Sequence, residues 1–256
     1  MTDLAKAGLL LELDHENTVA TITLNRPERR NAQSPTMWKG LEDLGRELPE
    51  TVRIVVLKGA GPSFSAGIDL RLFTPEGMPG EPAVLSAGVG PEELVEKIGE
   101  YQEGFRWLRD PRFTTIAAVH GHAIGAAFQL ALSCDIRIAA EDVQFCMKEP
   151  ALGLVPDLTG TKPLVDIVGL PRALELCLTA RVIDADEARE LRLVERVVKA
   201  DELDDAVEEL VNALLRIEVG AARATKELLQ KAPGNTLEEQ CLAERRAQVG
   251  RLLRNS

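Results

Sequence analysis

Residues 114–157 read T-T-I-A-A-V-H-G-H-A-I-G-A-A-F-Q-L-A-L-S-C-D-I-R-I-A-A-E-D-V-Q-F-C-M-K-E-P-A-L-G-L-V-P-D. Thr114–Val119 is a short apolar run, and after Gly125 the apolar residues recur at helical spacing. Gly121 and Gly125 interrupt the chain between these two runs. This part of the sequence therefore predicts a strand, a tight turn and a helix.

The predicted helix begins with the small residues Gly125, Ala126 and Ala127. They leave the backbone N–H groups of the first turn uncovered, and a helix N-terminus attracts negative charge. One interpretation is that a negatively charged ligand group approaches these N–H groups. The alternative is that the small residues only allow the helix to pack closely on its strand, and the spacing alone does not separate the two.

The composition is that of an ordinary globular protein, with 256 residues, 45% hydrophobic and 28% charged. The formal net charge of -11 argues against a surface that binds nucleic acid or anionic membranes. A phosphate-bearing ligand would therefore need a local basic patch.

The cysteine pattern and the N-terminal sequence indicate the cellular compartment. The cysteines Cys134, Cys146, Cys177 and Cys241 lack metal-ligand spacing and predict reduced core residues. The first residues, M-T-D-L-A-K-A-G, lack the pattern of a secretory signal, and no apolar run approaches membrane-spanning length. We therefore expect a cytoplasmic location.

Strands and helices alternate before the central stretch. Residues 8–13 and 18–24 predict a hairpin, and Ser34 followed by proline predicts the start of a helix that continues to about residue 48. The β-branched run V-R-I-V-V-L at 52–57 predicts a buried strand. It runs into the glycine-rich segment K-G-A-G-P-S-F-S-A-G-I-D-L at 58–70.

Residues 74–91 contain four prolines and four glycines, which predicts an irregular loop, either a lid or a linker. A helix is predicted at 92–108, and two short strands at 136–139 and 143–146. From residue 161 the pattern is nearly all helical, with helices at 161–168, 171–179, 185–191, 202–217, 220–231 and 237–253. The whole pattern predicts a layered α/β core with a C-terminal helical region.

Two separate segments place small residues where a strand meets a turn. They are S-A-G-I-D at 65–69 and H-A-I-G-A-A at 122–127. If the backbone N–H groups of Ile68 and Ala126 converge, they provide the two donors that an oxyanion hole requires. Each donor would stabilise a thioester enolate by about 3 kcal/mol.

Four motifs occur in order along the chain: T-I-T-L-N-R-P-E-R-R-N-A (21–32), F-S-A-G-I-D-L (64–70), A-A-V-H-G-H-A-I-G-A-A-F-Q-L-A-L-S-C-D (117–135) and Q-F-C-M-K-E-P-A-L-G-L-V-P-D (144–157). Together they resemble the crotonase, or enoyl-CoA hydratase/isomerase, superfamily over nearly the whole length of the chain.

The resemblance implies an α/β fold of the crotonase (ClpP-like) type, built from repeated β-β-α turns. The core would span residues 1–195, and residues 196–256 would form a helical trimerisation region. The family assembles as trimers or dimers of trimers. A further helical tail that packs over the pocket or a neighbour would be expected after residue 256.

The resemblance also implies a coenzyme A thioester as substrate, with no separate cofactor. The thioester carbonyl would lie between the N–H groups of Ile68 and Ala126. The residues that the resemblance places on the CoA side are Arg30, Ala66, Gly67, Asp69, Arg71 and Gly125. By position alone, Asp69 and Asp135 lie at the ends of elements and indicate structural roles.

Hydratases of the family use two glutamates, and the matching positions here are Gln129 and Glu149. A glutamine orients water but does not exchange a proton, and losing one acid/base partner costs about 100-fold to 10,000-fold in rate. A double-bond shift needs only one carboxylate, so Glu149 could act alone as proton shuttle. The alternative for Glu149 is a solvated surface residue.

Asp157 lies where the dienoyl-CoA isomerases of the superfamily place a second catalytic carboxylate. Those enzymes also carry an aspartate where this chain has Gln129, so the match is partial. The alternative is that Asp157 caps the following helix. His120 and His122 have no third ligand nearby and predict a turn rather than a metal site.

The sequence therefore predicts an enzyme that isomerises the double bond of an enoyl-CoA through an enolate. The alternatives are a hydratase (lyase), in which Gln129 holds the water and Glu149 performs both proton steps, and a non-catalytic acyl-CoA-binding protein. The length of the acyl chain is not predicted.

Overall fold

A computed structural model describes residues 3–14, 16–74, 77–81 and 90–254. The predicted irregular loop at 74–91 therefore lies mostly outside the described residues. Within it, the described residues 77–81 form turns, in which the Glu81 backbone N–H donates to the carbonyl of Met78.

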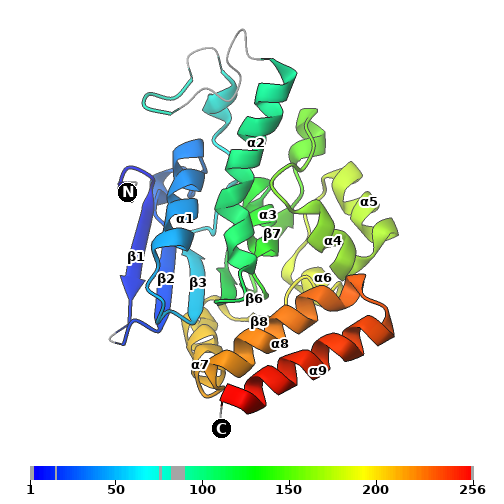
Figure 1. Cartoon of the computed structure of the whole chain (residues 1–256). Coiled ribbons are helices and arrows are strands. Elements are labelled where there is room, and N and C mark those ends of the chain that lie inside the picture. The colour runs from blue at the N-terminus through cyan, green and yellow to red at the C-terminus, as the bar shows by residue number, and fades with distance from the viewer. Residues whose placement is uncertain (1–2, 15, 75–76, 82–89, 255–256) are drawn as a thin grey trace.

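A six-stranded sheet forms the centre of the molecule (Figure 1), in the order β1-β2-β3-β4-β6-β8. Its strands are β1 (Leu9–Leu13), β2 (Val19–Leu24), β3 (Ile54–Gly59), β4 (Thr114–Val119), β6 (Ile136–Ala140) and β8 (Arg196–Val198). β1 and β2 pair antiparallel, which confirms the predicted hairpin, and the remaining neighbours pair parallel.

A second, two-stranded sheet lies beside the first and pairs β5 (His122–Ile124) with β7 (Gln144–Cys146) in parallel. The predicted tight turn between β4 and the following helix was wrong, because His122–Ile124 forms a strand. The prediction that the chain is nearly all helical from residue 161 also missed β8. Both strands have three residues, too few to show an alternating pattern.

Helices cover the sheets and continue to the C-terminus. They are α1 (Pro35–Glu47), α2 (Pro91–Arg106), α3 (Ala126–Ser133), α4 (Thr161–Val168), α5 (Leu170–Thr179), α6 (Ala185–Glu190), α7 (Leu203–Leu215), α8 (Val219–Lys231) and α9 (Leu237–Arg254). Ser34 caps α1 as predicted, because its side chain accepts a hydrogen bond from the N–H of Met37.

Both faces of β3 and β4 are buried, and this explains their nearly continuous apolar sequences. Val55 and Leu57 of β3 face the main core, which includes residues from α1 and α3. Ile54 and Val56 face the opposite way, onto a second cluster that contains residues of α7. The period-two alternation of a strand thus distributes its side chains between two cores.

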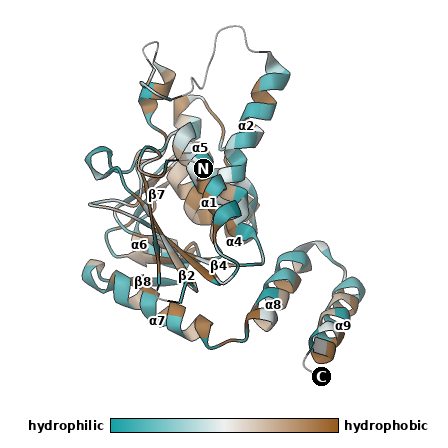
Figure 2. Cartoon of the chain, turned by 60° about the vertical axis from the view of Figure 1, so that its left-hand side comes forward, coloured by the Kyte–Doolittle hydropathy of each residue, from teal (hydrophilic) through white to brown (hydrophobic). Residues whose placement is uncertain are grey.

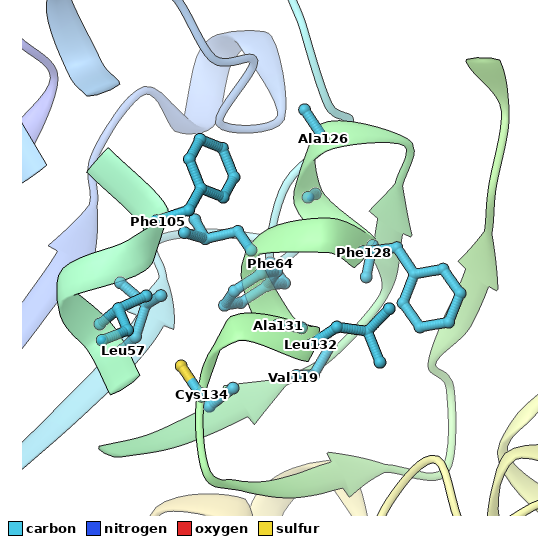
Figure 3. Packing of buried hydrophobic residues seen from close by; sticks show 14 of the residues in the cluster. Leu57, Phe64, Phe105, Val119, Ala126, Phe128, Ala131, Leu132 and Cys134 are labelled. Carbon is cyan, nitrogen blue, oxygen red and sulfur yellow. The ribbon is translucent and has the colours of Figure 1, made fainter. Parts of the chain in front are cut away.

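Helix α3 lies inside the main core, and each of its residues is buried. Figure 3 shows Phe64 and Phe105 packed near this helix, with Phe128 of the helix itself pointing away from Phe105. Phe128 packs on Phe145, with their ring centroids 5.0 Å apart. Because packing surrounds α3 on several sides, we expect its N-terminus to be held in a fixed position.

The C-terminal part of the chain divides into two kinds of structure. β8 and α7 belong to the sheet and its cover. α8 and α9 lie side by side and extend away from the sheet (Figures 1 and 2). α8 is tied back by Lys226, whose ammonium group donates to Asp135 at 2.7 Å. Several large apolar residues of this segment are exposed, among them Ile217, Leu229, Leu237, Val249 and Leu252.

Replacing Phe128 by alanine should lower the apparent free energy of unfolding by about 3–5 kcal/mol, because it opens a cavity beside Phe145. Val95→Ala, on the exposed face of α2, should change it by about 0.5 kcal/mol or less. Urea denaturation monitored by circular dichroism measures both. Equal losses in the two variants would contradict the placement of Phe128 in the core.

Candidate active site

Two loops that are distant in sequence pair with each other at the N-terminus of α3. The Ser65 N–H donates to the carbonyl of His122 at 2.8 Å, and the Ile124 N–H donates to the carbonyl of Ser65 at 3.2 Å. Gly67 has a φ of +85°, and a Cβ there would lie 2.3 Å from the carbonyl oxygen of Ile124. Only glycine allows this approach.

The N–H groups of Ile68 and Ala126 are left available by this pairing. Gln33 exchanges hydrogen bonds with the two neighbours of Ile68, accepting from the N–H of Asp69 and donating to the carbonyl of Gly67. Ala126 is the first residue of α3, where the N–H has no helical acceptor. In the described part of the chain, no acceptor is paired with either N–H, and both residues line the same pocket.

This acyl pocket, as we call it, has a volume of about 330 Å³. Its walls are mostly apolar and come from α1, α2, the 3₁₀ helix η2 (Leu70–Phe73) and the segment that follows Glu149. The apolar residues include Trp38, Phe73, Leu94, Ile98, Leu154 and Leu158. Glu149 and Asp157 are the acidic residues that line it.

Glu149 is a buried carboxylate, with an exposed fraction of 9%. The interpretation as a solvated surface residue was therefore wrong. Its Oε1 accepts a hydrogen bond from Nε2 of Gln129 at 2.7 Å, whereas its buried Oε2 has no partner among the described residues. Burial raises the pKa of Glu149, and the negative charge of Asp157 raises it further.

Gly125 makes room for the Glu149 carboxylate beside α3. Its φ of 55° and ψ of -118° suit glycine, and a Cβ there would lie 3.1 Å from Oε1 of Glu149. The small residues at the start of α3 therefore serve more than packing against the strand, because they place a carboxylate next to the free N–H of Ala126.

Gln129 is fully buried and does not line the acyl pocket. Its Oε1 accepts from the N–H groups of Leu158 and Gly160 at 2.9 and 3.1 Å, while its Nε2 donates to Glu149. One amide hydrogen is left for any other partner. These hydrogen bonds hold Gln129 against Glu149, and the expectation that Gln129 also orients a water stays a prediction that depends on this remaining hydrogen.

Asp157 lies in the acyl pocket and is half-buried. Burial raises the pKa of its carboxyl group. The interpretation of Asp157 as a helix cap was wrong, because α4 begins at Thr161 and its cap residue is Gly160, with no side-chain hydrogen bond to the helix. Two carboxylates therefore share one apolar pocket, in which the ionisation of one disfavours that of the other.

The residues that the sequence places on the CoA side lie around the 65–67 loop, outside the acyl pocket. The Ala66 N–H donates to the carbonyl of Arg30, whose side chain is exposed. Asp69 accepts hydrogen bonds from the guanidinium groups of Arg71 and Arg26, and hydrogen bonding to Arg71 lowers the pKa of its carboxyl group. Asp69 therefore fixes the start of η2.

The remaining polar residues have structural partners. His120 Nε2 is 2.9 Å from the Gly61 carbonyl, and His122 Nδ1 is 3.0 Å from the Ser63 hydroxyl. Asp135 accepts from the N–H of Thr115 and from Lys226. Residues 3–14, 16–74, 77–81 and 90–254 contain no group of three metal-ligating side chains. None of the described helices has the length and apolarity needed to span a bilayer.

The acyl pocket is also lined by Tyr101, Lys97 and Trp38, which were not predicted from the sequence. Trp38 and Tyr101 come from α1 and α2, with their ring centroids 5.1 Å apart. Tyr101 is the single tyrosine of the chain, and this is only weak evidence that it belongs to a functional site. Nothing in the local sequence shows that these helices face the loops around Ile68 and Ala126.

The model of the enoyl-CoA hydratase/isomerase family matches residues 14–251. The chain belongs to this family. Its fold is the crotonase fold, and the protein is an enzyme of the crotonase type. The fold and the family predicted from the four motifs are thereby confirmed.

Curated relatives carry out more than one reaction of the family. The short-chain-enoyl-CoA hydratase of Clostridium acetobutylicum is 33% identical over 226 residues, which are 86% of this chain and 80% of that protein. The peroxisomal Delta(3,5)-Delta(2,4)-dienoyl-CoA isomerase of Arabidopsis thaliana is 33% identical over 237 residues, which are 90% and 84% of the two chains. Sequence identity therefore does not separate hydration from isomerisation.

An enoyl-CoA hydratase candidate of Thermobifida fusca is similar to this chain in both sequence and structure. Its crystal structure in complex with CoA has a TM-score of 0.93 and 58% identity, and covers 98% of this chain and 95% of its own. In complex with acetoacetyl-CoA the TM-score is 0.94, again at 58% identity, with 98% and 97% covered.

Glu149→Gln should stabilise the protein at alkaline pH relative to wild type. Because burial raises the pKa of Glu149, the fold keeps a proton that the unfolded chain releases, so wild-type stability falls as the pH rises through the folded pKa. We expect the variant to melt higher than wild type above that pKa, by about 2–4 °C per kcal/mol.

Differential scanning calorimetry between pH 4 and pH 9 measures this difference. Glu244→Gln, at an exposed position of α9, is the control and should show a constant offset. A melting difference for Glu149→Gln that does not grow with pH would contradict the burial of its charge.

Proposed function

We propose that this protein shifts the carbon–carbon double bond of an enoyl-CoA through an enolate. The observation that carries the proposal is the arrangement around Glu149. Glu149, whose buried Oε2 has no partner among the described residues, lines the pocket that Ile68 and Ala126 also line, and the N–H groups of these two residues are free. The amide of Gln129, at the position of the first of the two hydratase glutamates, is occupied with structural hydrogen bonds.

In the proposed reaction, Glu149 removes a proton from the carbon next to the thioester of a 3-enoyl-CoA. The electrons of that C–H bond form a double bond between the thioester carbon and the second carbon, so the negative charge of the resulting dienolate rests on the thioester oxygen. The double bond between the second and third carbons forms when the fourth carbon is protonated and the thioester carbonyl is restored. The N–H groups of Ile68 and Ala126 would stabilise this charge by about 3 kcal/mol each. The protonated Glu149 then returns its proton to the fourth carbon.

The raised pKa of Glu149 suits both halves of this reaction. A carboxylate in an apolar pocket is a stronger base than one in water, and its conjugate acid remains available for the return step. Asp157 supports the same role, because its charge adds to the pKa shift of Glu149. We propose that Asp157 acts either as the second proton carrier or as the charge that tunes Glu149.

The proposed substrate is a coenzyme A thioester, and no separate cofactor is needed for this chemistry. The T. fusca protein, solved with CoA and with acetoacetyl-CoA, supports this choice of ligand at 58% identity. Arg30 and Arg71 would supply the positive charge that CoA phosphates require on an otherwise acidic protein. We also propose that the exposed apolar residues of α8 and α9 pack in a homotrimer or a dimer of trimers, in the cytoplasm.

Hydration is the second candidate function, and the names of several relatives favour it. It would require Glu149 to perform both proton steps, with the remaining amide hydrogen of Gln129 as the only contact from that residue to a water. Because one acid/base partner is absent, hydration should be about 100-fold to 10,000-fold slower than with two glutamates.

Proton exchange tests the enolate step directly. Wild-type protein in deuterium oxide should introduce deuterium next to the thioester of an enoyl-CoA, and Glu149→Gln should slow this about 100-fold to 10,000-fold. Mass spectrometry of the recovered thioester measures the exchange, with Glu244→Gln as control. Exchange that survives Glu149→Gln would show that another group is the base, and its absence with every acyl-CoA in wild type would contradict the enolate step.

Gln129→Glu separates isomerisation from hydration, because it restores the hydratase glutamate that this chain lacks. We expect hydration of a 2-enoyl-CoA to rise about 100-fold or more. The loss of absorbance of the conjugated thioester measures the rate. Gln144→Glu, at an exposed position of β7, should leave it unchanged. Rapid hydration by wild type would favour the hydratase.

A further inference from the structure

The hydroxyl group of Tyr101 is a buried polar group that the proposed mechanism does not use. Tyr101 is 7% exposed and lines the acyl pocket together with Ile68, Ala126 and Glu149. Its hydroxyl oxygen has no hydrogen-bond partner among the described residues. Buried tyrosine hydroxyls are normally paired, and leaving one unpaired costs about 1–3 kcal/mol. The missing partner therefore requires an explanation.

The ring of Tyr101 is held firmly in place. It packs on Trp38 with an interplanar angle of 55°, and the Nζ of Lys97 lies 5.6 Å from its centroid. Trp38 is itself fixed, because its Nε1 donates to Oε1 of Gln33 at 2.9 Å. The ring of this pocket-lining residue is thus fixed, and it holds a buried, unpaired hydroxyl group.

The pocket around Tyr101 is otherwise suited to hydrocarbon. Leu94, Ile98, Leu154 and Val155 contribute apolar side chains to its lining. A saturated or unsaturated hydrocarbon chain would fill this space and leave the hydroxyl unpaired. An acyl chain that carries an oxygen at the right carbon would fill the same space and pair with it.

The charges near Tyr101 favour a neutral oxygen over a carboxylate. Burial raises the pKa of the Tyr101 hydroxyl and outweighs the lowering effect of the Lys97 charge, while the charges of Glu100 and Glu81 add to the rise, so the hydroxyl remains protonated and can donate. Lys97 is paired with Glu100 at 2.8 Å. Glu149 and Asp157 line the same pocket, and like charges there would repel an anionic chain.

We propose that Tyr101 donates a hydrogen bond to a hydroxyl or carbonyl oxygen on the acyl chain, so that the protein selects oxygen-bearing acyl-CoA thioesters over hydrocarbon ones. The inference rests on the proposed function for the ligand class, a CoA thioester in the acyl pocket. The inference adds that the acyl chain carries an oxygen atom. A site that pairs a substrate oxygen discriminates far more strongly than one that only fills space.

Calorimetric titration tests the inference without turnover. The ligands are hexanoyl-CoA and hexanoyl-CoA thioesters that carry a hydroxyl or a keto group at successive carbons beyond the third. We expect at least one oxygen-bearing thioester to bind wild type about 5-fold to 150-fold more tightly than hexanoyl-CoA. Tyr101→Phe keeps the ring on Trp38 and should abolish this preference while binding hexanoyl-CoA as well as wild type does.

Comparison of the hydroxy and keto series shows which oxygen the site takes. Thr179→Val removes a hydroxyl on the exposed end of α5 and should keep the wild-type preference. Equal binding of all thioesters by wild type, or equal losses for both classes in Tyr101→Phe, would overturn the inference but leave the proposed function intact. Binding of hexanoyl-CoA without proton exchange of enoyl-CoA would instead contradict the proposed function.

Discussion

The side-chain amide of Gln129 is the constraint on which the site depends. From within α3 it accepts from the N–H groups of Leu158 and Gly160 and donates to Glu149. A Cβ on Gly160 would lie 2.5 Å from Cγ of Gln129, so glycine is needed for this contact. One buried group thus joins helix α3, the Glu149 carboxylate and the segment that carries Asp157. Buried polar networks of this kind define a single arrangement because each broken bond leaves an unpaired group.

The other half of the site is made by the backbone. Ile68 and Ala126 contribute N–H groups, so their side chains matter only through size and packing. The conformations of Gly67 and Gly125 bring those N–H groups to one pocket. Because donors fixed in a folded backbone need no reorganisation when charge develops, this construction suits enolate chemistry.

Much of the fold could be predicted from the sequence, because long elements have clear periodicity. The hairpin β1-β2, the strand β3 and the helix α1 with its Ser34 cap follow from local pattern alone. β5 and β8 could not be predicted, because three residues show no period and their pairing is set by distant strands. Their partners are visible only in three dimensions.

The site was predictable where a motif fixes the backbone and unpredictable where helices meet. Glu149, Asp157 and the two N–H groups belong to motifs, and the structure places all four in one pocket. The role of Gln129 required coordinates, because its partners at 158 and 160 are distant in sequence. Tyr101 depends on the packing of α2 against α1, which no local pattern encodes.

The second face of the sheet is covered by a helix that comes late in the chain. In the folded protein, Leu203 and Val207 of α7 form a buried cluster with Ile54, Ile116 and Ile138 of the sheet. At about 5–20 residues per second, a ribosome takes several seconds to pass from β6 to α7. During that interval a nascent chain would present an apolar sheet face to water. Synthesis of this enzyme should therefore depend on chaperones that shield the partly completed sheet.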